Sequence, residues 1–510
     1  MAFEDFLPEV GEKGRSQILW VFSFAIPIIF ISSHFLLENF TAFVPEHWCW
    51  VHFLDNTSAL LNVSGNLNFS SLLKLSIPLD SNGKPERCHQ FFWPQWQPLG
   101  PNVTGQNMSQ LEMEPCVDGW VYDQGIFTSS IVTEWDLVCD SQTLKYLSQS
   151  ILLAGNLVEY LIWGYLSDRM LLPSYLMMAV SSTGNTFVQS FPVYCCFLFL
   201  FGSSIPGVTL GSLTLIQEWT NSQHRPLVTV IFTLYFSLGH LFLRLVAYGI
   251  QEWRELQLVM SVPFFAFFLA SWWLPEFAGW LIFQNRYDEV LKVLTKVAKI
   301  NGVKETTLTI EVRGEGGAMA GIWEMVAFQA KPSSQGPTKR KVPSLMIFTT
   351  SLIFYGLSLD LHNLGSNIQT LQVLLGASAF LSRSGALFIM NLCGCRTIAV
   401  ACLLLAELFI PARAFLPQEI LRVVLAMLAI SSIVVYLLCS DRGRCKGLNL
   451  MVGRIGAVLA PLVNTLKHYL PALPPIIFAA MAITAGLVVF FLPETQNKPT
   501  SDTIEDLEYG

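Results

Sequence analysis

Residues 18–37 read ILWVFSFAIPIIFISSHFLL, a run of 20 residues with no Asp, Glu, Lys or Arg. At 1.5 Å per residue, a helix of this length spans about 30 Å, the thickness of the hydrocarbon core of a bilayer. The run is also too long and too uniformly apolar for a strand of a membrane barrel. It therefore predicts a transmembrane helix, preceded by a polar segment.

The rest of the chain repeats this pattern. Hydrophobic residues make up 52% of it and charged residues 13%, against about 25% charged residues in a typical soluble protein. The net charge of −7 provides no basic stripe for a nucleic acid backbone, so no nucleic acid partner is expected. The ninth run is short and contains Glu407, which leaves a count of eleven or twelve spans. The further runs cover residues 146–166, 171–190, 194–216, 227–250, 256–274, 345–359, 370–390, 397–410, 420–439, 447–466 and 474–492.

Two long polar stretches of opposite charge separate the runs. Residues 38–143 hold three basic and twelve acidic residues, whereas residues 283–343 hold ten basic and six acidic ones. Because Lys and Arg accumulate on the cytosolic side of membrane proteins, we expect the second stretch in the cytosol and the first outside.

The first stretch carries two further marks of an outer loop. All six N-x-Ser/Thr sequons lie there, as in a glycosylated loop, although an Asn-, Ser- and Thr-rich composition alone would also generate sequons. Four cysteines in an oxidising compartment favour two disulfides, with three connectivities open. The sequon asparagines are Asn39, Asn56, Asn62, Asn68, Asn102 and Asn107, and the cysteines are Cys49, Cys88, Cys116 and Cys139.

An even number of spans with the first loop outside leaves both termini in the cytosol of a plasma membrane protein. Within the basic stretch, residues 287–300 alternate apolar residues and lysines at helical spacing, which predicts an amphipathic helix. The expected order is a cytosolic N-terminus (1–17), span 1 (18–37), the extracellular loop (38–143), spans 2–6 (144–282), a cytosolic linker loop (283–343), spans 7–12 (344–492) and a cytosolic tail (493–510).

Short sequence motifs carry information that the composition does not. GYLSDR at 164–169 ends the second span, and GCR at 394–396 follows the eighth. They resemble the cytosolic G-x-L-x-D-R-x-G-R-R motif of the major facilitator superfamily. In that motif, charges beside helix ends act as a latch that stabilises one arrangement of the two halves. The latch residues matched here are Gly164, Asp168, Arg169, Gly394 and Arg396.

Longer strings resemble solute carrier family 22, most of all its organic anion branch and the hepatic members that handle steroid conjugates. The resemblance covers nearly the whole chain. It implies a twelve-helix bundle of two six-helix halves that expose a central site alternately to each side, by facilitated diffusion or by exchange against a counter-anion. The matching strings include CWVH (49–52), SIPLDSN (76–82), PCVDGW (115–120), TEWDLVC (133–139), LGSN (364–367) and LPET (492–495).

Two arginines point to the charge of the substrate. Arg383 is the single Asp, Glu, Lys or Arg between residues 361 and 395, and Arg454 is the single one between 447 and 466. Because a charge at mid-bilayer costs about 2.5 to 3.5 kcal/mol, such a residue usually faces a cavity or a partner. The resemblance matches both to cavity positions, and Arg454 to an arginine of the anion carriers. The alternative is that either side chain reaches an interface or a helix C-terminus.

The resemblance also implies partners for an apolar substrate. Tyr355 and Phe354 match aromatic residues of the family pocket, Phe236 could complete a ring face, and His34 matches a histidine of the anion branch. Ordinary packing is the alternative for each aromatic residue and for His34.

No catalytic, nucleotide-binding or metal-binding motif is apparent, so we expect no enzyme activity, no cofactor and no metal. The main hypothesis is a carrier of small organic anions. The alternative is a transport-deficient paralogue that acts as a binding or regulatory protein, because Met170 to Pro173 replace the family's G-R-R and Gly279 replaces an arginine. Glu159 and Arg244, both costly in a span, could neutralise each other if their helices meet.

Overall fold

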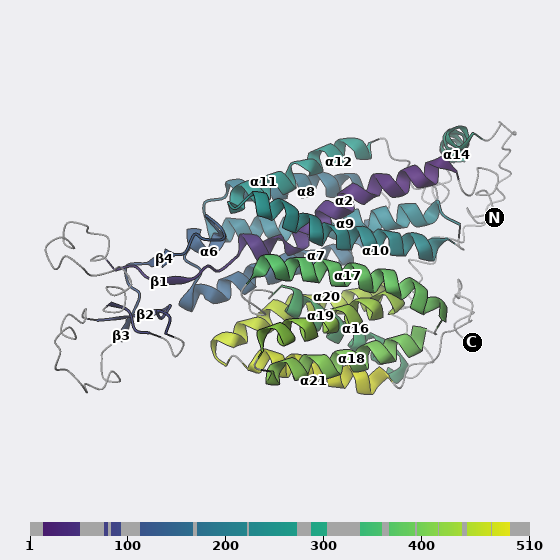
Figure 1. The fold of residues 1–510 in the computed structure, drawn as a ribbon. Coiled ribbons are helices and arrows are strands. Elements are labelled where there is room, and N and C mark those ends of the chain that lie inside the picture. Colours follow the sequence, from purple (N-terminus) through teal and green to yellow (C-terminus); the bar gives the residue numbers. More distant parts are fainter. Residues whose placement is uncertain are drawn as a thin grey trace, which may run out of the picture. The chain divides into compact units, whose positions relative to one another are not determined.

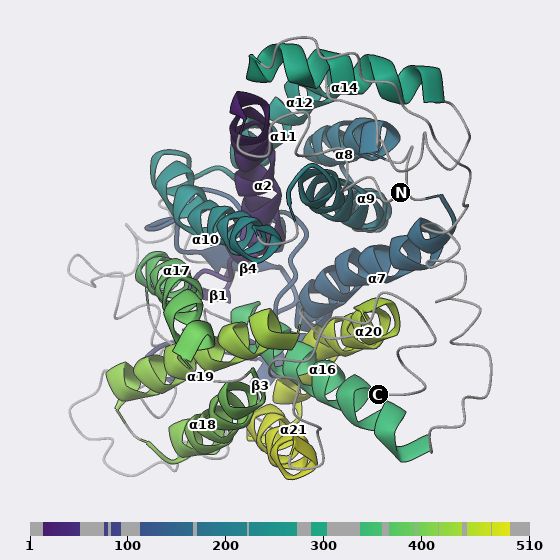
Figure 2. The same ribbon diagram turned by 90° about the vertical axis from the view of Figure 1, so that its right-hand side faces the viewer.

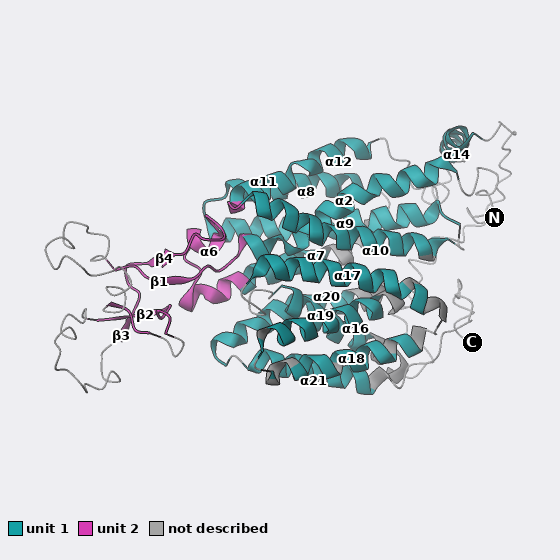
Figure 3. Ribbon diagram, viewed as in Figure 1, with its two compact units in different colours: residues 1–40, 146–250, 254–510 teal, residues 41–145, 251–253 magenta. Residues whose placement is uncertain are grey.

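The structure is a computed structural model that describes residues 14–51, 76–79, 83–92, 113–166, 171–221, 224–272, 287–302, 337–359, 367–392, 395–416, 418–440, 446–470 and 472–489. The chain divides into two compact units (Figure 3). Unit 1 comprises Met1–Phe40, Tyr146–Ile250 and Arg254–Gly510, and unit 2 comprises Thr41–Lys145 and Gln251–Trp253. Unit 1 is helical in the described residues, and the described strands lie in unit 2.

Helices lie at every apolar run of the sequence (Figure 1). The sixth run consists of two helices, α11 and α12, because Pro263 lacks the N–H that would continue the first. The N-terminal helices are α2 (Arg15–Thr41), α7 (Gln142–Leu166), α8 (Leu171–Gly184), α9 (Phe191–Glu218), α10 (Arg225–Gly249), α11 (Trp253–Ser261) and α12 (Pro263–Ser271). The C-terminal helices are α16 (Pro337–Ser358), α17 (Ile368–Leu392), α18 (Cys395–Phe415), α19 (Glu419–Ser440), α20 (Lys446–Thr465) and α21 (Leu473–Val489).

Part of the helical bundle is long and apolar enough to cross a membrane. Within the described residues, five segments meet that condition by length and composition. Three shorter apolar helices, in α16, α18 and α21, accompany them. The five segments are Arg15–Thr41, Phe191–Glu218, Leu227–Gly249, Trp253–Ser271 and Ile420–Leu437.

Close helix packing organises unit 1. Among the C-terminal helices, α16 packs on α20, and α18 packs on α19 and α21. The principal contact between the N-terminal and C-terminal helices runs between α10 and α17, which lie side by side in Figures 1 and 2. Small residues allow the closest approaches, since a Cβ added at Gly202 of α9 would clash with the carbonyl oxygen of Leu152 on α7.

Unit 2 contains short antiparallel strands that the sequence did not predict. Strand β1 (His47–Cys49) pairs with β4 (Trp120–Tyr122), and β2 (His89–Phe91) pairs with β3 (Met113–Pro115). The Lys84 ammonium hydrogen-bonds the Glu46 carboxylate and lowers its pKa. The described part of the loop is therefore a small ordered unit.

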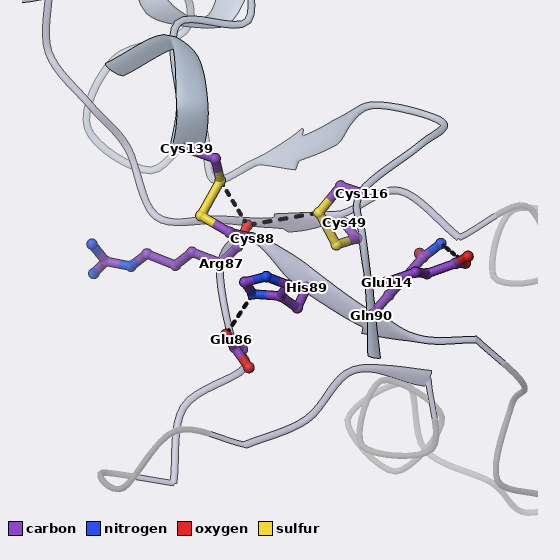
Figure 4. Close-up of a disulfide and its surroundings, with 9 residues drawn as sticks. All are labelled: Cys49, Glu86, Arg87, Cys88, His89, Gln90, Glu114, Cys116 and Cys139. Atoms are coloured by element: carbon purple, nitrogen blue, oxygen red, sulfur yellow. Dashed lines mark hydrogen bonds and ion pairs between the residues drawn. A yellow bond between two sulfur atoms is a disulfide. The ribbon is translucent and has the colours of Figure 1, made fainter. Parts of the chain in front are cut away.

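Two disulfides close this unit, which selects one of the three connectivities. Cys49 is bonded to Cys116 and Cys88 to Cys139, with Cα atoms 5.2 and 5.7 Å apart (Figure 4). The bridged residues are 67 and 51 positions apart in sequence. In the chain-entropy model, each loop of that length contributes about 4 kcal/mol to stability.

Candidate functional site

Arg383 lies on α17 and faces α10. Its side chain is 9% exposed, and its Nη1 donates a hydrogen bond to the Ser237 hydroxyl of α10. The guanidinium carbon also lies 5.7 Å from the centre of the Phe236 ring, within the range of a cation–π contact. The structure thus brings together two of the residues expected at the site. Neither of these partners is a carboxylate, so neither cancels the positive charge.

Further polar contacts continue along the same helix pair. Arg244 donates to the Gln369 side-chain oxygen at 2.9 Å and to its carbonyl oxygen at 3.2 Å. One turn further on, the Gln372 amide donates to the carbonyl oxygen of His240 at 3.4 Å. Gly376 sits against Leu241, where a Cβ would require that side chain to shift. We call the contacts Arg244–Gln369, His240–Gln372 and Ser237–Arg383 the α10–α17 polar row.

Arg454 lies on α20 and faces α16. Its Nη1 donates to the Tyr355 hydroxyl at 2.8 Å, and the side chain is half-buried. The adjacent glycines explain the close approach, because a Cβ at Gly453 would press on Ile347 and one at Gly456 would clash with the Phe348 carbonyl of α16. The Phe354 and Tyr355 rings meet edge to face at 5.3 Å. Arg454, Tyr355 and Phe354 therefore form a second cluster.

His34 has a different environment from either arginine cluster. Its ring contacts Phe201 at 4.8 Å and Phe264 at 5.2 Å, both on N-terminal helices. It lines a small cavity of about 10 Å³, the room of roughly one water molecule, which neither arginine lines. The other lining residues are Leu37, Glu38, Leu152, Asn185, Tyr194, Leu198, Phe201 and Gln257. The structure thus surrounds His34 with N-terminal helices and does not unite it with the arginines.

Most of the expected latch lies outside the described residues. Gly164 is in the last turns of α7, and Arg396 is the second residue of α18, although its side chain is not described. Asp168, Arg169 and Gly394 belong to segments that the structure leaves undescribed. The side chain of Glu159 is likewise undescribed, while Arg244, its expected partner, bonds Gln369.

The structure differs from the sequence prediction at Asn39. This residue lies on α2, is 4% exposed, and donates through Nδ2 to the carbonyl oxygen of Ser358 at 3.0 Å. A glycan would be attached to that same nitrogen, and the buried side chain leaves no room for one in this arrangement. The other sequon asparagines, Asn56, Asn62, Asn68, Asn102 and Asn107, lie outside the described residues.

Sequence reasoning missed most partners in the α10–α17 polar row. Ser237, His240, Gln369 and Gln372 are single polar residues within or beside apolar runs, and only the pairing of α10 with α17 gives them a role. The spacing of Gln369, Gln372 and Arg383 puts them on one helix face, which was the available signal. The partner helix was not readable from the sequence.

Comparison with known proteins extends these observations. No protein-family model matches the chain. The chain is 42% identical to solute carrier family 22 member 11 of Homo sapiens over 536 residues, covering 100% of this chain and 96% of that protein. It is 41% identical to the steroid transmembrane transporter SLC22A24 of Homo sapiens over 531 residues, covering 100% and 96%.

Solved structures show the same architecture at low identity. The inward-open xylose transporter XylE from E. coli aligns with a TM-score of 0.55 and 14% identity, covering 72% of this chain and 90% of that one. The structure of the same symporter with a bound bromodeoxyglucose, described as a major facilitator superfamily protein, gives a TM-score of 0.54 and 15% identity, with the same coverage. The chain thus has the same fold as these two structures. With its full-length relatives more than 40% identical, the chain belongs to solute carrier family 22.

Proposed function

We propose that the protein carries organic anions across the plasma membrane by alternating access, with Arg454 as the main group that binds the anionic end of the substrate. The observation that carries the proposal is the Arg454–Tyr355 contact, in which a neutral hydroxyl 2.8 Å away orients a half-buried guanidinium. A guanidinium stays charged when partly desolvated and offers paired donors to a carboxylate or sulfate.

Arg383 is the proposed second cation, and the aromatic rings are the proposed partners for an apolar substrate body. Phe236 lies beside Arg383, and Phe354 lies beside Tyr355. Amphipathic anions such as steroid sulfates, glucuronides or large carboxylates combine both features. Two relatives support this class, since the human and mouse lemur (Microcebus murinus) proteins named SLC22A24 are called steroid transmembrane transporters.

The proposed topology has twelve spans in two six-helix halves, with spans 2–6 within residues 144–282 and spans 7–12 within 344–492. Both termini and the linker loop 283–343 are cytosolic, and the disulfide loop 38–143 is extracellular. The charge contrast between the two loops supports this orientation. Proposed glycosylation is confined to Asn56, Asn62, Asn68, Asn102 and Asn107, and the proposed cytosolic latch comprises Gly164, Asp168, Arg169, Gly394 and Arg396.

Exchange against a counter-anion is the proposed mode of turnover. Each elementary charge that crosses a potential of 100 mV changes the free energy by about 2.3 kcal/mol. An exchanger moves a second anion in the opposite direction, which removes most of this electrical cost. Preloading cells with a dicarboxylate should therefore accelerate uptake.

Uptake by the full-length protein in cells tests the proposal. Surface protein is quantified by biotinylation, and uptake of a labelled steroid sulfate is measured over a range of concentrations, with a labelled organic cation as the control substrate. We expect saturable uptake of the sulfate that exceeds uptake of the cation. Absence of saturable sulfate uptake despite normal surface delivery would contradict the proposal.

A further inference from the structure

The amphipathic helix expected at 287–300 is present as α14 (Tyr287–Asn301). Its apolar residues Val290, Leu294 and Val297 are buried. Lys292, Lys296 and Lys299 are exposed and follow one another at spacings of four and three residues, so they form one row along the helix. We call these three residues the lysine row. It gives the central and C-terminal turns of α14 a cationic face.

A contact with α2 gives the depth of this helix. Asn301, the last residue of α14, accepts a hydrogen bond from the Ser16 backbone N–H at 2.9 Å. Ser16 is the second residue of α2, and the exposed apolar surface of that helix begins two residues later. The exposed side chains are Ile18 at 57%, Leu19 at 58% and Phe22 at 63%.

Exposed apolar side chains on a membrane helix face acyl chains. Two residues of helix correspond to about 3 Å along its axis. The C-terminal end of α14 therefore lies at the boundary of the hydrocarbon, where phospholipid headgroups begin. Arg15, also exposed, adds a further cation at the start of α2.

The orientation of α14 keeps its other residues near this depth. In Figure 1, α14 is seen end-on while the bundle helices run across the view, and in Figure 2, α14 itself runs across the view. The helix therefore lies crosswise to the bundle axis, along the plane of the membrane. Its buried apolar face packs within unit 1, so the lysine row is available to groups outside the protein.

We propose that the lysine row binds the anionic headgroups of phospholipids in the cytosolic leaflet. Charge complementarity selects this partner, because the cytosolic leaflet carries a negative surface potential and basic residues at headgroup depth are attracted to it. On the same helix, the exposed Asp288 and the half-buried Glu289 precede the row in the first turn, and no acidic residue lies between its three lysines. The assignment to the cytosolic leaflet rests on the topology proposed above.

Lipid binding by the purified full-length protein tests this proposal. Energy transfer from the protein's tryptophans to dansyl-labelled phosphatidylserine reports binding in a neutral detergent, and unlabelled phosphatidylserine or phosphatidylcholine serves as competitor. We expect phosphatidylserine to compete at least about tenfold better, since each basic residue near an anionic surface contributes roughly fivefold. Raising the NaCl concentration to about 0.5 M should weaken the preference for phosphatidylserine, because salt screens the attraction between the lysines and the headgroups.

Substitutions in α14 test whether the lysine row causes the preference for phosphatidylserine. The triple variant Lys292→Gln, Lys296→Gln, Lys299→Gln should lose it, whereas the corresponding triple arginine variant should keep it. Lys84→Gln, at an exposed lysine of unit 2, is the matched control and should behave as wild type. Thermal melting verifies that the variants are folded.

Two results would overturn the proposal. One is equal competition by the two lipids in the wild type. The other is an unchanged preference for phosphatidylserine in the folded triple glutamine variant. The lysine row would then bind another partner, such as an acidic protein segment. Binding of a labelled steroid sulfate to the same preparation separates this outcome from a failure of the transport proposal.

Discussion

The two arginine clusters differ in which helices they join. Arg383 is nearly buried and bonds Ser237, so its contact connects a C-terminal helix to an N-terminal helix. Arg454 is half-buried and bonds Tyr355, so its contact stays within the C-terminal helices. When the two groups of helices rock against each other, the first contact must change and the second can persist.

From this difference we propose distinct roles for the two arginines. Arg454 can present the same donors in every state of the transport cycle, as a constant binding group requires. We propose that Arg383 and the rest of the α10–α17 polar row are coupled to the conformational change. Substitutions at the two positions should therefore have different signatures.

The largest effect is expected for Arg454→Asp. An acidic group in place of the guanidinium repels the substrate and removes the charge-assisted hydrogen bonds to its anionic end, each worth about 1.5 to 3 kcal/mol. Uptake of a steroid sulfate should fall by more than roughly a hundredfold. Arg454→Lys should recover part of it, because an ammonium keeps the charge but lacks the paired geometry. Equal uptake by the aspartate and lysine variants would contradict this role.

Uptake of a steroid sulfate should fall by roughly tenfold to a hundredfold for Arg383→Gln. The variant removes one cation and a hydrogen bond to a charged donor, worth about 1.5 to 3 kcal/mol. Hydrogen–deuterium exchange should rise in α10 and α17 of this variant and remain unchanged in Arg454→Gln. Ser203→Ala, at a serine that donates within α9, is the control substitution outside the α10–α17 polar row. The distinction between the two arginines would be contradicted if both variants changed hydrogen–deuterium exchange in the same helices.

A smaller effect is expected at Gln369. Replacing it with Glu turns the contact with Arg244 into an ion pair across α10 and α17, which should hold the helices together more strongly. Maximal uptake should fall about fivefold, corresponding to roughly 1 kcal/mol. The double variant Arg244→Gln, Gln369→Glu removes the new pair and should restore uptake. No recovery would show that the glutamate acts in another way.

The smallest effect is expected for Tyr355→Phe. The change removes the hydroxyl that orients Arg454 and leaves the ring, at a cost of about 0.5 to 1.5 kcal/mol. The KM for a steroid sulfate should rise about threefold while maximal uptake changes little. A reduced maximal rate with an unchanged KM would remove Tyr355 from the binding site.

The sequence predicted the helices better than their partners. Apolar runs such as 18–37 correspond directly to helices, because a bilayer requires both length and apolarity. The pairing of Arg454 with Tyr355 could have been predicted, since the resemblance to the family matched both residues to the binding pocket. The choice among three disulfide connectivities was not, because it depends on the pairing of β1 with β4 and β2 with β3.

The differences between prediction and structure at His34 and Asn39 have a common physical cause. His34 and Asn39 lie within one turn and a half of each other on α2, yet one contacts Phe201 and the other bonds Ser358. Their neighbours come from helices far away in sequence, and helical periodicity specifies a face of a helix without naming the helix that covers it. Tertiary packing therefore decided both outcomes.

Equilibrium binding tests the central claim most directly, because it does not require turnover. A labelled steroid sulfate is titrated into the purified full-length wild type and into Arg454→Gln, with folding of each verified by thermal melting. The account predicts that the glutamine variant binds the sulfate at least about a hundredfold more weakly than the wild type. Equal affinity of the two proteins would contradict the role of Arg454 as the anion-binding group.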